Sequence, residues 1–140
     1  QEQRRRARTE LLGRVAQDVR DAWHELALLE AADRKTAAEA VRWAEKDWQN
    51  RKDVHAADTL AWALSQHGDR SEAEAALTQA LAPGGVSASL LLHAAAIRWR
   101  ASHADEARAL LDRAVVCPVA LTPQERWLRG RVESEVASQH

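Results

Sequence analysis

The chain has 140 residues, of which 46% are hydrophobic and 29% are charged, and its formal net charge is −1. This composition is typical of a folded globular domain and excludes a disordered or low-complexity chain. A net charge close to zero also argues against nucleic acids and anionic membrane surfaces as partners, because both require a strongly basic face.

The single cysteine, Cys117, excludes an internal disulfide and is compatible with a reducing compartment. The N-terminus is charged and no apolar run is long enough to span a bilayer, so neither a signal peptide nor a membrane segment is predicted. We therefore expect a cytoplasmic location. Because the chain has no Met and starts at Gln1, we also expect it to be a piece of a longer protein.

One long amphipathic helix is predicted from Gln1 to about Asp33. The segment contains no proline, and its apolar residues step by three and four, at Leu12, Val15, Val19, Ala22, Leu26 and Leu29. Gly13 weakens this helix and is the position where a break could occur. Residues 1–19 form an N-terminal helical extension that needs a partner surface of its own.

The next helix is predicted to begin with a capping box formed by Thr36 and Glu39 and to run to about Asn50. Asp53 is the predicted cap of the helix that follows, and Gly68 supplies the residue that ends it. A return helix starts at Asp69 and stops at the Pro83–Gly85 turn.

Ser87 is predicted to cap a helix that reaches about Ala101, and Ser102 with Asp105 to cap its return helix, which ends at Cys117. The most complete signal for the start of a helix lies at residues 122–125. Thr122 is the predicted cap, proline occupies the first helical position and glutamate occupies the third. This signal predicts a terminal helix over residues 121–140 that closes the end of the domain.

Small and large apolar residues recur at one constant interval, which we call the repeat period. It separates Leu60 from Ala94, Ala73 from Ala107, Leu77 from Leu111, and Ala80 from Ala114. A period of about 34 residues with two helices per unit predicts a stacked array of helical hairpins.

These residues resemble the tetratricopeptide repeat consensus in order and spacing, and the run from Asp58 to Trp62 with His93–Ala94 resembles the repeats of bacterial members. The resemblance covers about Asp21 to Val136, and Ser102 departs from it because glycine is usual there. It implies an all-α, right-handed α-α superhelix with three repeats (about 20–52, 53–86 and 87–120, together 20–120), an extended N-terminal helix and a C-terminal capping helix. It also implies a protein-protein interaction module, not an enzyme.

In such a fold the first helix of each repeat lines a concave groove that holds a peptide or a helix of a partner protein. The groove positions that the resemblance assigns as partner-binding are His55, Asp58, Trp62, Gln66, Ser89, His93, Trp99 and Arg100. In the first repeat the corresponding positions include His24 and Leu28. Apolar side chains of the partner would lie on the two tryptophans, while its polar groups would pair with the aspartate, the histidine and the arginine.

Structural interpretations of these residues remain open. Asp58 and His93 could hydrogen-bond to each other and fix the angle between repeats, while Trp62 fills the core. Trp43 and Trp48 are expected to pack on the N-terminal helix, and Trp127 is expected to pack the capping helix onto the third repeat, because no Phe or Tyr is present to fill such sites.

Two alternative functions also remain. The N-terminal helix could pair with a second copy as a homodimer or fold into the chain's own groove, and the domain could be a regulatory segment of a larger protein. The sequence contains no glycine-rich phosphate loop, HExxH motif or CxxC pair, so we expect no catalytic residues, no metal site and no cofactor.

Overall fold

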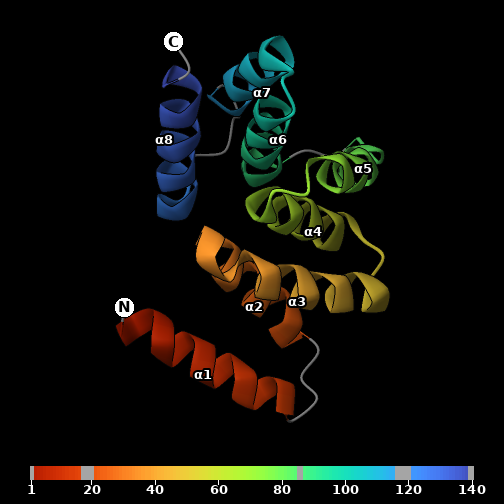
Figure 1. Cartoon of the computed structure of the whole chain (residues 1–140), viewed down its shortest axis with the longest axis vertical. Helices are drawn as coiled ribbons and strands as arrows, with labels where there is room; N and C mark the ends of the chain where they lie inside the picture. The colour runs from red at the N-terminus through yellow and green to blue at the C-terminus, as the bar shows by residue number, and fades with distance from the viewer. Residues whose placement is uncertain (1, 17–20, 85–86, 116–120, 139–140) are drawn as a thin grey trace. The chain divides into compact units, whose positions relative to one another are not determined.

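The computed structural model describes residues 2–16, 21–84, 87–115 and 121–138, and these residues contain helices and no strand (Figure 1). The elements are α1 (Glu2–Ala16), α2 (Asp21–Ala31), the short 3₁₀ helix η1 (Arg34–Thr36), α3 (Ala37–Asn50), α4 (Val54–His67), α5 (Arg70–Leu81), α6 (Ala88–Arg100), α7 (Ala104–Val115) and α8 (Pro123–Ala137). The predicted all-α class is confirmed. The chain divides into two compact units, Gln1–Ala80 and Leu81–His140.

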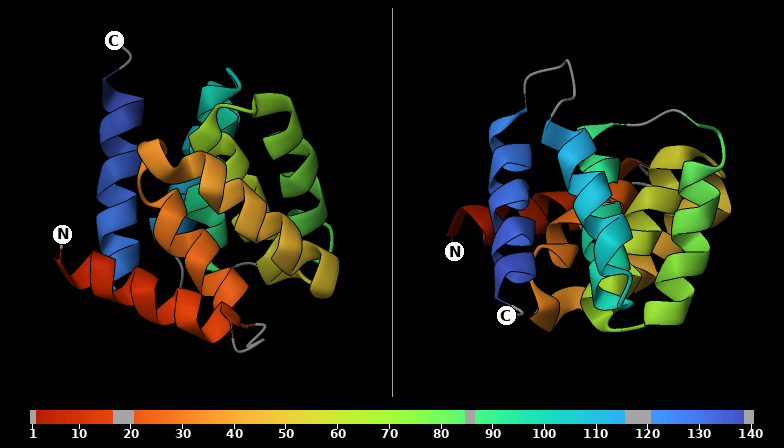
Figure 2. Two further views of the ribbon diagram at one scale, coloured as in Figure 1. Left: turned by 60° about the horizontal axis from the view of Figure 1, so that its bottom comes forward. Right: turned by 90° about the horizontal axis from the view of Figure 1, so that it is seen from above.

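In the first unit, α2 packs against α1, α3 and α4, and α3 also packs against α4 (Figure 2). The buried apolar positions of these helices are mostly alanine, with Leu11, Leu26, Trp62 and Leu64 as the larger side chains. Because alanine has no side chain beyond Cβ, helices with alanine at their contacts can approach closely and pack with few voids.

The prediction of one continuous N-terminal helix is wrong. Helix α1 ends at Ala16, α2 begins at Asp21, and the two helices pack against each other (Figure 1). Leu11 of α1 is buried with Ala22 and Leu26 of α2, and Leu12 and Val15 lie beside them. A continuous helix would leave this apolar seam exposed in a single chain, whereas two helices bury it. Gly13 lies inside α1, and Val19 lies outside the described residues.

The predicted capping box at the start of α3 is also wrong. Thr36 makes no side-chain cap bond to α3. Its hydroxyl donates to the Glu30 carbonyl oxygen at 2.6 Å and accepts from Arg4 at 3.0 Å, while Glu39 pairs with Arg8 at 3.1 Å. Residues of α1 and α2 therefore bind both side chains of the expected capping box, the Thr36 hydroxyl and the Glu39 carboxylate.

Two tryptophans on α3 have different environments. Trp43 packs against the cluster around Leu11, as predicted for packing on the N-terminal helix. Trp48 lines a hollow with Leu60 and Leu64 of α4 and Ala76 of α5, and its packing on the N-terminal helix stays a prediction.

In the second unit, α6 packs against both α7 and α8 (Figure 1). Leu92, Ala95 and Ile97 of α6 are buried, as are Val132 and Val136 of α8. Trp127 is 58% exposed, so the prediction that it packs α8 onto the third repeat is wrong. Helix α8 is held by its two valines instead, since they lie on the opposite part of its surface from the exposed indole.

The turns that end α4 and α6 have the same geometry. Gly68 and Ser102, one repeat period apart, have φ angles of 92° and 69°. The Asp69 N–H donates to the Leu64 carbonyl at 2.9 Å, and one period later the His103 N–H donates to the Arg98 carbonyl at 2.8 Å. Gly68 and Ser102 likewise donate to the carbonyls of Ser65 and Trp99. This pattern is a Schellman motif, in which a left-handed residue ends the helix.

Ser102 was predicted to cap the return helix, and this prediction is wrong. It is the left-handed residue of the preceding turn, and the Ala107 N–H bonds to the backbone carbonyl of His103. The predicted caps at Asp53 and Ser87 are confirmed. The side chains of Asp53 and Ser87, which are also one repeat period apart, accept from the N–H groups of Ala56 and Leu90 at 2.9 and 3.1 Å.

Candidate functional site

Four of the predicted partner-binding residues lie along α4 in the first unit. His55 is exposed, Asp58 and Gln66 are half-buried, and Trp62 is only 8% exposed. Gln66 Nε2 donates to the carbonyl oxygen of Ala31 at 2.8 Å, which joins α4 to the last turn of α2. A buried Trp62 offers little surface to a partner, and its burial agrees with the alternative in which it fills the core.

The other four lie along α6 in the second unit. Arg100 donates from Nε and Nη2 to the two carboxylate oxygens of Glu135, at 2.9 and 3.0 Å. The Ser89 hydroxyl donates to Glu125 Oε2 at 3.2 Å. Both bonds join α6 to α8, so these two side chains hold the terminal helix in place, a role that the sequence did not indicate.

His93 and Trp99 complete the α6 group. His93 is 6% exposed, and Trp99 is half-buried with the guanidinium carbon of Arg108, from α7, at 5.5 Å from the ring centroid. At this distance the guanidinium contributes a cation-π attraction. Because the α4 and α6 groups belong to different units, the predicted continuous groove and the suggested Asp58–His93 hydrogen bond both stay predictions.

Sequence reasoning missed a buried ionic network between α2 and α3. Asp47 is fully buried, and its carboxylate receives bonds from His24 Nδ1 at 2.9 Å and from Nε and Nη2 of Arg51 at 3.0 and 3.2 Å. A sequence signal was present, because Ala40, Ala44 and Asp47 step by four and three along one apolar stripe. A carboxylate on such a stripe must be paired when it is buried.

A second missed network joins α1 to α2, η1 and α3. Arg8 donates to Glu30 Oε1 at 3.0 Å and to Glu39 Oε2 at 3.1 Å, and Arg4 donates to the Leu29 carbonyl at 3.1 Å and reaches Asp33 at 3.5 Å. The hydrogen bond to Glu39 and the charge of Glu30 raise the pKa of Arg8. The Lys35 N–H and then Arg4 lower the pKa of Asp33. Glu30 follows Ala22 and Leu26 at four-residue steps, the same signal as at Asp47.

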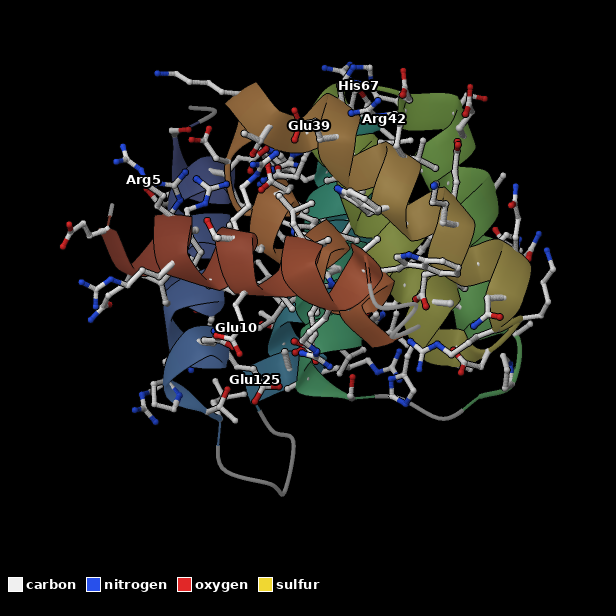
Figure 3. All side chains as sticks on the ribbon, turned by 90° about the horizontal axis from the view of Figure 1, so that it is seen from below. Arg5, Glu10, Glu39, Arg42, His67 and Glu125 are labelled. Atoms are coloured by element: carbon white, nitrogen blue, oxygen red, sulfur yellow. The ribbon has the colours of Figure 1, made fainter. Side chains whose placement is uncertain are left out.

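Two hollows lie on the first unit. The smaller, about 230 Å³, is lined by Trp48, Leu60 and Leu64 with Glu45 and Glu72 at its edge. The larger, about 370 Å³, is lined by charged and hydroxyl-bearing residues, namely Arg4, Arg5, Arg8, Glu30, Thr36 and Glu39. Figure 3 shows Arg5 on α1 and Glu39 on α3. Neither hollow contains a residue of the predicted groove.

The described part of the chain holds no group of three or more His, Cys, Asp or Glu side chains that could bind a metal ion. Among the helices within that part, none is both long enough and apolar enough to cross a bilayer.

Comparison with protein-family models, curated proteins and solved structures found no match to this chain. The family resemblance therefore stays a prediction. It rests on the sequence period and on the local geometry described above.

Proposed function

We propose that this chain is a protein-binding domain of the tetratricopeptide type, which holds a peptide or a helix of a partner protein on the first helices of its hairpins. The observation that carries the proposal is the return of one turn geometry after one repeat period, at Gly68 and at Ser102. The helix starts behave in the same way, since α4 and α6 begin one period apart, as do α5 and α7. In a stack of helical hairpin repeats, positions one repeat period apart are expected to have the same local geometry.

Within the first unit, the candidate surface is formed by α2 and α4, which pack side by side. Its accessible members are Leu28, which is 40% exposed, His55, which is exposed, and the half-buried His24 and Asp58. The apolar anchor on this surface is Leu28 and not the buried Trp62 as the sequence suggested. An exposed leucine on two packed helices that also carry imidazole and carboxylate groups suits an amphipathic peptide.

The test is a selection of binders from a displayed random-peptide library against the full chain, followed by measurement of affinity by fluorescence anisotropy. Leu28→Ala and Asp58→Ala should each weaken the selected peptides by roughly tenfold, as expected for residues near the centre of an interface. Gln79→Ala, at an exposed position of α5, is the matched control and should leave affinity unchanged. Equal affinities for all four proteins would overturn the proposal.

Homodimerisation through the N-terminal helix was the main alternative. Its apolar seam at Leu11, Leu12 and Val15 lies against α2 and Trp43 of the same chain. That surface is therefore covered within one chain, and no observation favours its pairing with a second copy. The role as a regulatory segment of a larger protein stays compatible with the proposed binding activity.

A further inference from the structure

Helix α1 contacts the rest of the first unit through one stripe that is basic at one end and apolar at the other. Arg4 and Arg8 reach Asp33, Glu30 and Glu39, and Leu11 and Val15 continue the same stripe onto α2. The steps of four, three and four residues keep these side chains on one face of the helix. The surface beneath α1 therefore matches a basic amphipathic helix in both charge and apolarity.

The basic end of this contact is incompletely filled. Glu30 is 1% exposed; its Oε1 accepts from Arg8 Nε, but its buried Oε2 has no hydrogen-bond partner among the residues that the structure describes. An arginine that approached a carboxylate end-on would donate to both oxygens. The hollow of about 370 Å³ lies at the same place, between Arg4, Arg5 and Arg8 of α1 and residues of α2, η1 and α3. A buried acceptor left unpaired is costly, so a better-fitting donor would be favoured.

The apolar part of the attachment of α1 is also modest for a helix of its length. Leu11 is its only buried side chain among those described, and Leu12 and Val15 are partly buried. Gly13 lies in its interior and lowers its helical propensity. An isolated helix of 15 residues is marginal in water, so α1 depends on the surface that it covers.

From these observations we infer that the surface formed by Ala22, Leu26, Glu30, Trp43 and Glu39 is a recognition site for an arginine-bearing amphipathic helix of a partner protein, and that α1 occupies this site within the chain. The partner helix would place an arginine against both oxygens of Glu30 and a leucine one turn later against Ala22 and Leu26. This site does not depend on the proposed function, because it lies between α1 and the α2–α3 pair and not along α2 and α4.

The probe is a fluorescently labelled synthetic peptide of residues 2–16, added to the full chain and followed by anisotropy. The parent protein should bind it weakly, because its own α1 competes at high effective concentration. Leu11→Ala in the protein loosens α1 and should raise peptide affinity by roughly tenfold or more. A peptide carrying Gly13→Ala should bind about fivefold tighter than the parent peptide, because alanine favours the helix. The added methyl group would meet no atom within 4 Å.

Glu30→Gln, combined with Leu11→Ala, should lower peptide affinity by roughly tenfold, because a charge-assisted pair is lost. Glu45→Gln makes the same change at an exposed position of α3 and should have no effect. If Leu11→Ala lowers the helical content of the whole domain, Arg8→Ala, at a half-buried position, replaces it. Equal affinity of the Glu30 and Glu45 variants, or no peptide binding to either loosened protein, would overturn the inference. Dimer formation by the loosened protein would assign the site to a second copy and would also overturn it.

Discussion

Ser102 holds a left-handed backbone conformation that normally favours glycine, with φ at 69°. Its counterpart one period earlier is Gly68, with φ at 92° and the same hydrogen bonds. The Cβ atom of an L-residue is strained in this region, and glycine has none. Ser102→Gly should therefore raise the free energy of unfolding by about 0.5–1 kcal/mol, because the relief of strain exceeds the added chain entropy. Urea denaturation, monitored by circular dichroism, measures the difference in the free energy of unfolding between the variant and the parent.

The reverse substitution supplies the control. Gly68→Ala adds a Cβ that meets no neighbouring atom within 4 Å, so no steric clash contributes to the change in stability. We expect a loss of about 1–2 kcal/mol. A Ser102→Gly protein that is less stable than the parent would contradict the equivalence of the two turns.

Asp47 is the second residue with a predictable effect on stability. Its buried carboxylate joins His24 of α2 to Arg51 at the end of α3. Asp47→Ala should lower the free energy of unfolding by about 2–4 kcal/mol, toward the lower end of values for broken buried pairs, since both partners stay partly exposed. Asp112→Ala, at an exposed position of α7, should change it by less than about 0.5 kcal/mol. Urea denaturation curves of both variants and the parent decide this.

At the level of single elements, the start of α8 gives a prediction that depends on pH. Thr122 and Glu125 form the predicted capping box, with N–H to side-chain bonds of 2.9 and 3.1 Å. The Thr122 N–H, and more weakly Ser89, lower the pKa of Glu125 below its ordinary value of 4.5. The ionised carboxylate is thus favoured by folding, and its contribution is present above pH 4.5 and lost as the pH falls through the lowered pKa.

Glu125→Gln should therefore destabilise the protein by about 0.5 kcal/mol at pH 7, because the negative charge at the helix N-terminus is lost. The difference between parent and variant should shrink toward zero as the pH falls well below 4.5. Thermal unfolding at a series of pH values measures it, with Glu45→Gln as the control. A difference that stays constant with pH would show that the charge does not act through the cap.

The helices themselves illustrate what local sequence signals can predict. The caps at Asp53, Ser87 and Thr122 were predicted correctly, because each depends on atoms within three residues. The box at Thr36 failed because Arg4, 32 residues away, competes for its hydroxyl. The break between α1 and α2 carries no proline or glycine signal at the boundary, and only the contact between the two helices accounts for it.

For the whole molecule, the repeat period agrees with the equal spacing of α4 and α6 and of α5 and α7, whereas the turn at Ser102 was predicted wrongly and the arrangement of the repeats and their boundaries stay predictions. The candidate site was less predictable. Periodicity indicates which face of a helix is apolar, but not which side chains a neighbouring helix covers. Ser89 and Arg100 were expected in a groove, yet they bind Glu125 and Glu135 of α8.

The oligomeric state is the prediction that belongs to this scale. Because the seam of α1 is covered within the chain, light scattering on residues 1–140 should give the mass of a single chain, 15.6 kDa. The same measurement on Glu10→Ala, an exposed substitution on α1, should give the same mass. A dimer mass for the parent at micromolar concentration would restore the alternative of homodimerisation.

Trp127, on the open face of α8, has a spectroscopic consequence. It is the only tryptophan among the described side chains that is mostly accessible, and the other five are buried or half-buried. Acrylamide should therefore quench its emission first, and replacing it with phenylalanine should shift the remaining fluorescence to shorter wavelength. The fluorescence of Trp127 in the native chain should therefore report the binding of another molecule to α8.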